Sequence, residues 1–213
     1  PVLLHISSNA VYRELFQQAF QTKPPAINFP NITRAIAAFQ RTIVSRNTAY
    51  DRFMAGDTAA LSPAARRGLT IFSSDRAKCA RCHTPPLFTD QRFHNTGLYN
   101  ADGNGGLPGA DKGLANETGR DEDTGRFRTP TLRNISVTGP YMHDGSLKSL
   151  AEIIDHYAAG GRAAINGPPS PVRSPHVTGF EISETEKEHL IRFLESLTDH
   201  QFLADPTLQT PFR

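Results

Sequence analysis

The sequence contains two cysteines, Cys79 and Cys82, and His83 directly follows the second. This C-x-x-C-H spacing is typical of covalent attachment of a c-type haem. Each thiol adds across one porphyrin vinyl group, and the helical turn between them places the imidazole as the proximal iron ligand. A redox disulfide needs a βαβ context and a zinc site needs two more clustered ligands, and the flanking sequence offers neither. A bare disulfide beside a coincidental histidine is the remaining alternative.

Composition narrows the class of protein around this motif. The chain has 213 residues, enough for one large or two small domains, and its 16 glycines and 16 prolines suggest long irregular connections. The formal net charge is +2 and no basic run stands out, so we expect no nucleic-acid partner. No apolar stretch approaches the ~18 residues of a membrane span, so we expect no membrane span.

The start of the chain carries no initiator methionine and no signal peptide. The abrupt beginning at Pro1 favours a fragment of a longer protein over a natural single-haem protein. Haem c is attached outside the bacterial cytoplasm. We therefore expect a periplasmic protein whose export signal is not in this chain.

Helical patterns lie on both sides of the motif, and each has an apolar face at three- to four-residue spacing. Asn9, Ser62, Ser149 and Ser183 are predicted N-caps, the last two each with a glutamate three residues later. Between the helices, residues 84–127 and 162–180 read as loops, and residues 126–147 as extended chain with turns. The predicted helices cover residues 9–20, 31–56, 64–72, 150–159 and 184–198.

These patterns predict an all-α fold: a cytochrome c-like haem domain with long Pro/Gly-rich loops and no convincing sheet. We expect residues 1–56 to form a helical segment leading in from a missing N-terminal haem domain. Residues 57–213 then form the C-terminal cytochrome c domain.

The second axial ligand decides whether the haem carries electrons or binds a small reactant. Met142 is the usual ligand type for electron-transfer cytochromes and lies in a tight turn. Tyr157 lies on the apolar stripe of a predicted helix, where a tyrosine is most often simple core. Neither these two nor an open site is excluded by spacing alone. The other candidates by residue type are Met54, His94, His143, His156 and His176.

Four polar residues near these candidates have two interpretations. Arg128 and Arg133 either pair with haem propionates or have structural roles, and His143 with Asp144 either tunes the haem or braces the turn. Four histidines are expected at the surface: His94, His176, His189 and His200.

Three stretches carry a resemblance to a known family. Phe127–Ile135 (FRTPTLRNI) with Thr138–Ser146 (TGPYMHDGS), and Ala35–Thr42 (AIAAFQRT), resemble the bacterial di-haem cytochrome c peroxidase and MauG superfamily. The ending, Leu194–Asp199 with Pro206 and Pro211-Phe212, looks most like the MbnH-type branch. The resemblance covers nearly the whole chain.

The resemblance implies a ligand set. In the classical peroxidases the C-terminal haem has a distal methionine, and in MauG and MbnH-type members a tyrosine replaces it. That position corresponds to Tyr157 here, whereas Met142 falls inside the P-Y-M-H-D-G turn. The family also binds calcium between its haems through backbone carbonyls, matching Thr138 and Pro140, as suits this hard cation.

The resemblance also implies a function for the intact protein. A Tyr157-ligated, six-coordinate haem would relay electrons and help stabilise a high-valent state in a peroxide-dependent di-haem oxidase. The peroxidatic haem would belong to an N-terminal haem domain, because this chain has no second C-x-x-C-H and no tryptophan. Further partners would be hydrogen peroxide and a small redox donor or a protein substrate. The alternatives are a classical cytochrome c peroxidase domain and a stand-alone mono-haem electron-transfer cytochrome.

Overall fold

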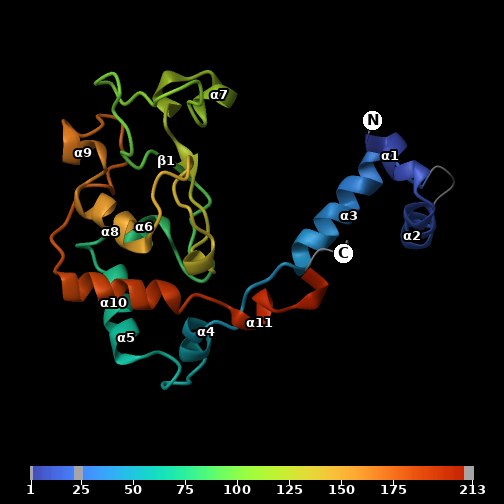
Figure 1. The fold of residues 1–213 in the computed structure, drawn as a ribbon, viewed down its shortest axis with the longest axis horizontal. Coiled ribbons are helices and arrows are strands. Elements are labelled where there is room, and N and C mark those ends of the chain that lie inside the picture. The colour runs from blue at the N-terminus through green and yellow to red at the C-terminus, as the bar shows by residue number, and fades with distance from the viewer. Residues whose placement is uncertain (1, 22–25, 209–213) are drawn as a thin grey trace. The chain divides into compact units, whose positions relative to one another are not determined.

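A computed structural model describes residues 2–21 and 26–208 of the chain, and it is helix-rich with little strand (Figure 1). Pro1 and Pro211-Phe212 lie outside the described residues. No helix among the described residues is long and apolar enough to cross a lipid bilayer. The α-helices are α1 Val2–Ser8, α2 Ala10–Phe20, α3 Phe29–Thr42, α4 Ala49–Met54, α5 Pro63–Phe72, α6 Cys79–Cys82, α7 Ala115–Thr118, α8 Leu150–Ala158, α9 Ala163–Asn166, α10 Glu184–Glu195 and α11 His200–Leu203. The strands are β1 Phe93–His94 and β2 Phe127–Arg128, and the 3-10 helices are η1 Asp121–Asp123, η2 Ile135–Val137 and η3 Pro206–Leu208.

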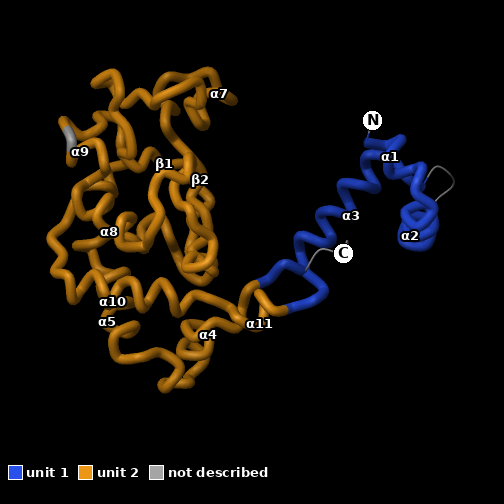
Figure 2. The backbone as a smooth tube through the Cα atoms, viewed as in Figure 1, with its two compact units in different colours: residues 1–44, 205–213 blue, residues 45–204 orange. Residues whose placement is uncertain are grey.

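The chain divides into two compact units (Figure 2). The first comprises residues 1–44 and 205–213, and the second comprises residues 45–204, including the C-x-x-C-H motif. The division into compact units does not test where the haem-binding domain begins, so the predicted boundary after residue 56 stays a prediction.

The first unit contains α1, α2 and α3. Asn9 caps α2 as predicted, because its side-chain oxygen accepts a hydrogen bond from the Val11 N–H at 2.9 Å. Phe16 of α2 and Ile32 of α3 are buried together with Ala26 and Ile27. This small cluster is the core of the unit.

The predicted single helix over residues 31–56 is wrong. The chain instead forms α3, which ends at Thr42, and α4, which begins at Ala49. The backbone N–H groups of Arg46 and Asn47 each donate to Asp199 at 2.9 Å, so they cannot make intrahelical hydrogen bonds. Thr48 then starts α4 through a reciprocal capping box with Asp51.

The second unit is built on the packing of α5 against α10 (Figure 1). Both helices begin as the sequence predicts: Ser62 caps α5 with Pro63 in the first turn, and Ser183 with Glu186 forms a capping box on α10. Helix α10 ends at Glu195, three residues earlier than expected. Gly68 allows the close approach, because a Cβ there would lie 2.0 Å from the His189 carbonyl oxygen.

An aromatic cluster joins this helix pair to the motif. Phe72, Phe88 and Phe193 are 0–2 % exposed, and Tyr50 packs against Phe88 and Phe193 with ring centroids 5.0 and 6.0 Å apart. Edge and tilted contacts of this kind stabilise aromatic pairs. Cys79 packs against the same hydrophobic core as this cluster, so the cluster supports the C-x-x-C-H motif.

The segment after the motif is largely irregular, as predicted, but it contains a short sheet that the sequence did not indicate. Strands β1 and β2 pair antiparallel with Phe93 opposite Arg128. Thr129 extends the ribbon by donating its N–H to the Arg92 carbonyl at 2.8 Å. Two-residue strands carry too few residues for an alternating pattern, which explains why they were missed.

Candidate haem site

The C-x-x-C-H residues lie on α6, a single helical turn. Lys78 precedes it in the left-handed conformation, and the His83 N–H closes the turn on the Cys79 carbonyl at 2.9 Å. Both cysteines are free thiols. Burial raises the pKa of Cys79 to about 12 and that of Cys82 to about 11, so both side chains are protonated at neutral pH.

The imidazole of His83 is oriented by the neighbouring loop. Its Nδ1 lies 3.0 Å from the Phe88 carbonyl oxygen. When Nδ1 donates this hydrogen bond, Nε2 keeps its lone pair and can bind a metal. Burial lowers the pKa of His83, which favours the neutral ring that ligation requires.

Tyr157 lies near the same turn, on α8. Ser149 caps this helix by accepting from the Glu152 N–H, but Glu152 itself accepts from Lys148, so only half of the predicted capping box forms. Burial raises the pKa of Tyr157, and the neighbouring sulfurs of Cys82 and Cys79 raise it further. The phenol therefore lies within electrostatic reach of both cysteines.

His156 has a different role from its neighbour. It is 1 % exposed, its Nε2 lies 3.0 Å from the Thr96 carbonyl, and its Nδ1 accepts from the Arg162 N–H at 2.9 Å. Both ring nitrogens are used by the backbone, so neither is available to iron in this arrangement. Burial lowers the pKa of His156 to about 4.

The remaining ligand candidates from the sequence lie in different surroundings. Met142 adopts φ 69° and, like Cys79, packs against the hydrophobic core of the second unit, so it remains a candidate. His143 stacks on Phe127 with ring centroids 3.9 Å apart. Met54 is 62 % exposed, and His176 is exposed.

Two polar residues of the family-like segment, Arg133 and Asp144, make contacts that stabilise the fold. Arg133 forms a bidentate pair with Asp51 at 2.8 Å and also donates to the Pro86 carbonyl, which occupies its guanidinium. Asp144 accepts from the Tyr99 hydroxyl and from the Ser146 N–H, which holds the H-D-G turn. These contacts favour the structural interpretation of both residues.

The two predicted calcium ligands are placed next to that turn. Thr138 and Pro140 are exposed and flank Gly139. Because both residues are exposed, a further ligand from another segment can reach an ion beside them. Calcium binding itself stays a prediction.

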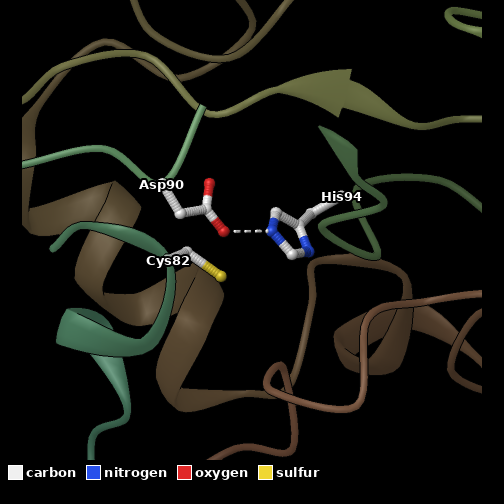
Figure 3. Close-up of side chains that lie close together, drawn as sticks. All are labelled: Cys82, Asp90 and His94. Atoms are coloured by element: carbon white, nitrogen blue, oxygen red, sulfur yellow. Dashed lines mark hydrogen bonds and ion pairs between the residues drawn. The ribbon is translucent and has the colours of Figure 1, made fainter. Parts of the chain in front are cut away.

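The structure places beside Cys82 one residue that the sequence did not single out, Asp90, and one that it offered only as a ligand candidate by residue type, His94. Asp90 and His94 lie beside Cys82, and the three potential ligand atoms are within 4.8 Å of one another (Figure 3). His94 was expected at the surface, but its side chain is only 21 % exposed and pairs with Asp90. Their i, i+4 spacing just after the motif was the available signal, and the surrounding loop pattern gave no reason to weigh it.

The residues at α6 fit haem c by their chemistry. Two thiols stand on one turn, a neutral imidazole follows them, and a phenol lies close by. With the helix-rich fold, this donor set is typical of haem-dependent redox proteins.

Comparison with known proteins agrees with this class. The family model of the di-haem cytochrome c peroxidase matches residues 1–59. The methylamine utilization protein MauG of Methylophilus methylotrophus is 39% identical over 190 residues, covering 87% of this chain and 51% of that protein. The cytochrome-c peroxidase IdrP1 of Denitromonas iodatirespirans is 37% identical over 211 residues, covering 85% of this chain and 54% of that protein.

A solved structure extends the likeness over the whole chain. The crystal structure of a MauG-like protein associated with microbial copper homeostasis superposes with a TM-score of 0.90 at 38% identity, covering 100% of this chain and 65% of that one. The chain belongs to the di-haem cytochrome c peroxidase and MauG superfamily. It spans about half the length of the curated relatives it matches. The family consists of haem-based peroxidases and oxidoreductases.

Proposed function

We propose that this chain is the C-terminal haem domain of a di-haem peroxidase-like oxidase of the MauG or MbnH type. In this proposal residues 57–213 have a cytochrome c-like fold and bind one covalent haem c. The observation that carries it is the single-turn C-x-x-C-H helix α6 with His83 Nδ1 3.0 Å from the Phe88 carbonyl, together with the electrostatic coupling of the Tyr157 phenol to both cysteines. The likeness to MauG and to the MauG-like structure supports the same assignment.

In this proposal each residue of the site has one task. Cys79 and Cys82 would hold the group covalently, and His83 would provide an iron-binding nitrogen in an orientation set by the Phe88 carbonyl. Tyr157 on α8 would provide a hard oxygen ligand. A haem held in this way supplies one-electron transfer, and an anionic oxygen ligand favours its more oxidised states.

The intact protein needs more than this chain. We propose an N-terminal haem domain as the peroxidatic partner, hydrogen peroxide as the oxidant, and a small redox protein or a protein substrate as the electron source. Thr138 and Pro140 would contribute backbone carbonyls to a calcium ion at that junction. Covalent haem c attachment argues for export to the periplasm.

A second candidate is the electron-transfer domain of a classical cytochrome c peroxidase. The residue type of Met142 favours it, because a thioether is a usual ligand of electron-transfer haems and this side chain packs against the same hydrophobic core as Cys79. A stand-alone mono-haem electron-transfer cytochrome is a third candidate, and the haem count of the full gene product separates it from the other two.

Axial-ligand spectroscopy tests the proposal. The chain is produced with covalent haem, and Tyr157→Phe is compared with the matched variant Met142→Leu by near-infrared and EPR spectra. We expect Tyr157→Phe to abolish the wild-type ligand signature and Met142→Leu to leave it unchanged. A His/Met signature in the wild type that disappears in Met142→Leu would refute the assignment in favour of the classical peroxidase.

A further inference from the structure

The side chain of Asp90 is held by the loop that follows the haem motif. Its Oδ2 accepts a hydrogen bond from His94 Nε2 at 2.7 Å, and its Oδ1 accepts from the Arg92 N–H at 2.9 Å (Figure 3). The side chain is only 14 % exposed. The short β1–β2 ribbon carries His94, and Thr129 at its end donates its hydroxyl to the Arg92 carbonyl at 3.2 Å. Asp90 therefore has a fixed position beside Cys82.

A metal ion is one explanation for the grouping of Cys82, Asp90 and His94, because sulfur, oxygen and nitrogen donors suit zinc. Two observations argue against it. Cys82 belongs to the haem attachment motif, which consumes its thiol, and the ring nitrogen of His94 that faces the group already donates to Asp90. The carboxylate needs another explanation.

The charge of Asp90 supplies that explanation. Although burial opposes ionisation, hydrogen bonds from His94 and the Arg92 N–H lower the pKa of Asp90 to about 2. The carboxylate is thus anionic across the physiological range. One of its oxygens lies within 4.8 Å of the Cys82 sulfur, one residue before His83, so the fixed negative charge is placed at the haem attachment turn.

We infer that Asp90 is a tuning residue that lowers the reduction potential of the haem bound at His83, with His94 and the β1–β2 ribbon holding its carboxylate against Cys82. This role rests on the proposed function. Oxidised haem iron carries one more positive charge than reduced iron, so a nearby fixed anion stabilises the oxidised form. The partial burial of the carboxylate limits screening by salt.

The test is the midpoint potential of the haem-bearing chain, measured by spectroelectrochemistry at pH 7. Asp90→Asn and Asp90→Ser remove the charge with different side-chain shapes, and Asp90→Glu retains it. Asp75→Asn is the matched control, because Asp75 is four residues before Cys79 but 88% exposed and paired with Arg81. Haem content and the axial-ligand spectrum are recorded for every variant.

We expect both neutral variants to favour reduction by about tenfold, which for a one-electron couple is 59 mV more positive. Asp90→Glu and Asp75→Asn should stay within twofold of the wild type. Neutral variants that also stay within twofold, or an equal shift in Asp90→Glu, would overturn the role of the charge. Failure of both neutral variants to attach haem, with Asp90→Glu attaching it, would overturn it too, because the carboxylate would then serve assembly. Absence of covalent haem from the wild-type chain would instead refute the proposed function itself.

Discussion

Replacing Gly68 with alanine tests the packing of α5 on α10, which supports the haem motif. In a solvent-exposed helix this substitution stabilises by about 1 kcal/mol, because glycine loses more backbone entropy on folding. At Gly68 the added Cβ would lie 2.0 Å from the His189 carbonyl oxygen and 2.7 Å from the Phe193 Cβ. Ordinary contacts begin near 3.4 Å, so the two helices must separate by more than 1 Å.

The magnitude follows from which atoms are in the way. Two of the three nearest atoms are backbone atoms of α10, and the third is a Cβ, so no side-chain rotation relieves the clash. Overpacking typically costs about 1–3 kcal/mol, and the upper end applies here because Phe193 is fully buried against Phe72 and Phe88. After the propensity gain of about 1 kcal/mol, we expect a net loss of about 2 kcal/mol in the free energy of unfolding.

Urea unfolding of the haem-bearing chain, followed by circular dichroism, measures this loss. With a slope of about 2 kcal/mol per molar urea, the midpoint should fall by about 1 M. Thr70→Ala is the control, because Thr70 lies two residues along the same helix on its exposed face, where alanine should be neutral or slightly stabilising. A Gly68→Ala chain as stable as the Thr70→Ala chain would refute the close helix crossing.

Three further predictions concern ionisable groups. The pKa of His156 is lowered to about 4 from an ordinary 6.5, so the folded state holds this ring in its neutral form, as is favourable above pH 6.5. We expect about 2 kcal/mol of the free energy of unfolding to be lost between pH 7 and pH 5. Urea titrations of His156→Gln should show a flatter pH dependence. The pKa of Asp51, which pairs with Arg133, is lowered from 3.8 to about 2. Its contribution of about 1–2 kcal/mol to the free energy of unfolding is therefore present above pH 4 and is lost as the pH falls towards 2. Acid titrations of Asp51→Asn should not show this loss. Asp199→Ala removes the acceptor for two backbone N–H groups before α4, and a loss of about 2 kcal/mol in the free energy of unfolding, seen by calorimetry, is expected.

Local signals in the sequence were sufficient for several elements. The caps Asn9, Ser62 and Ser183 form as predicted, because capping depends on a few adjacent residues. The prediction of one helix over residues 31–56 was wrong because the break in it depends on a residue that is distant in the sequence. Its interruption depends on Asp199, which lies about 150 residues away in sequence and takes hydrogen bonds from the interrupted segment.

The residues of the candidate site also differ in whether a local sequence signal or a long-range contact determines them. Cys79, Cys82 and His83 form a local motif, so spacing alone was enough to predict them as haem-binding residues. The choice between Met142 and Tyr157 depends on how two distant segments approach α6, which spacing cannot decide. Asp90 was missed because a carboxylate in a polar loop is usually solvated, and only the fold of β1 and β2 shows that this one is held beside Cys82.

In the proposed site, Asp90 and Tyr157 would act on the same equilibrium in the same direction. A fixed carboxylate and an anionic oxygen ligand both stabilise the oxidised form of a haem, whereas a thioether such as that of Met142 favours the reduced form. If Met142 were the ligand, Asp90 would oppose it, and the domain would combine two conflicting influences. With Tyr157 as ligand the two influences add, which is consistent with a haem that accepts and passes on oxidising equivalents. The double variant Asp90→Asn with Tyr157→Met should therefore raise the midpoint potential further than either single variant, and a potential no higher than that of Tyr157→Met alone would contradict this account.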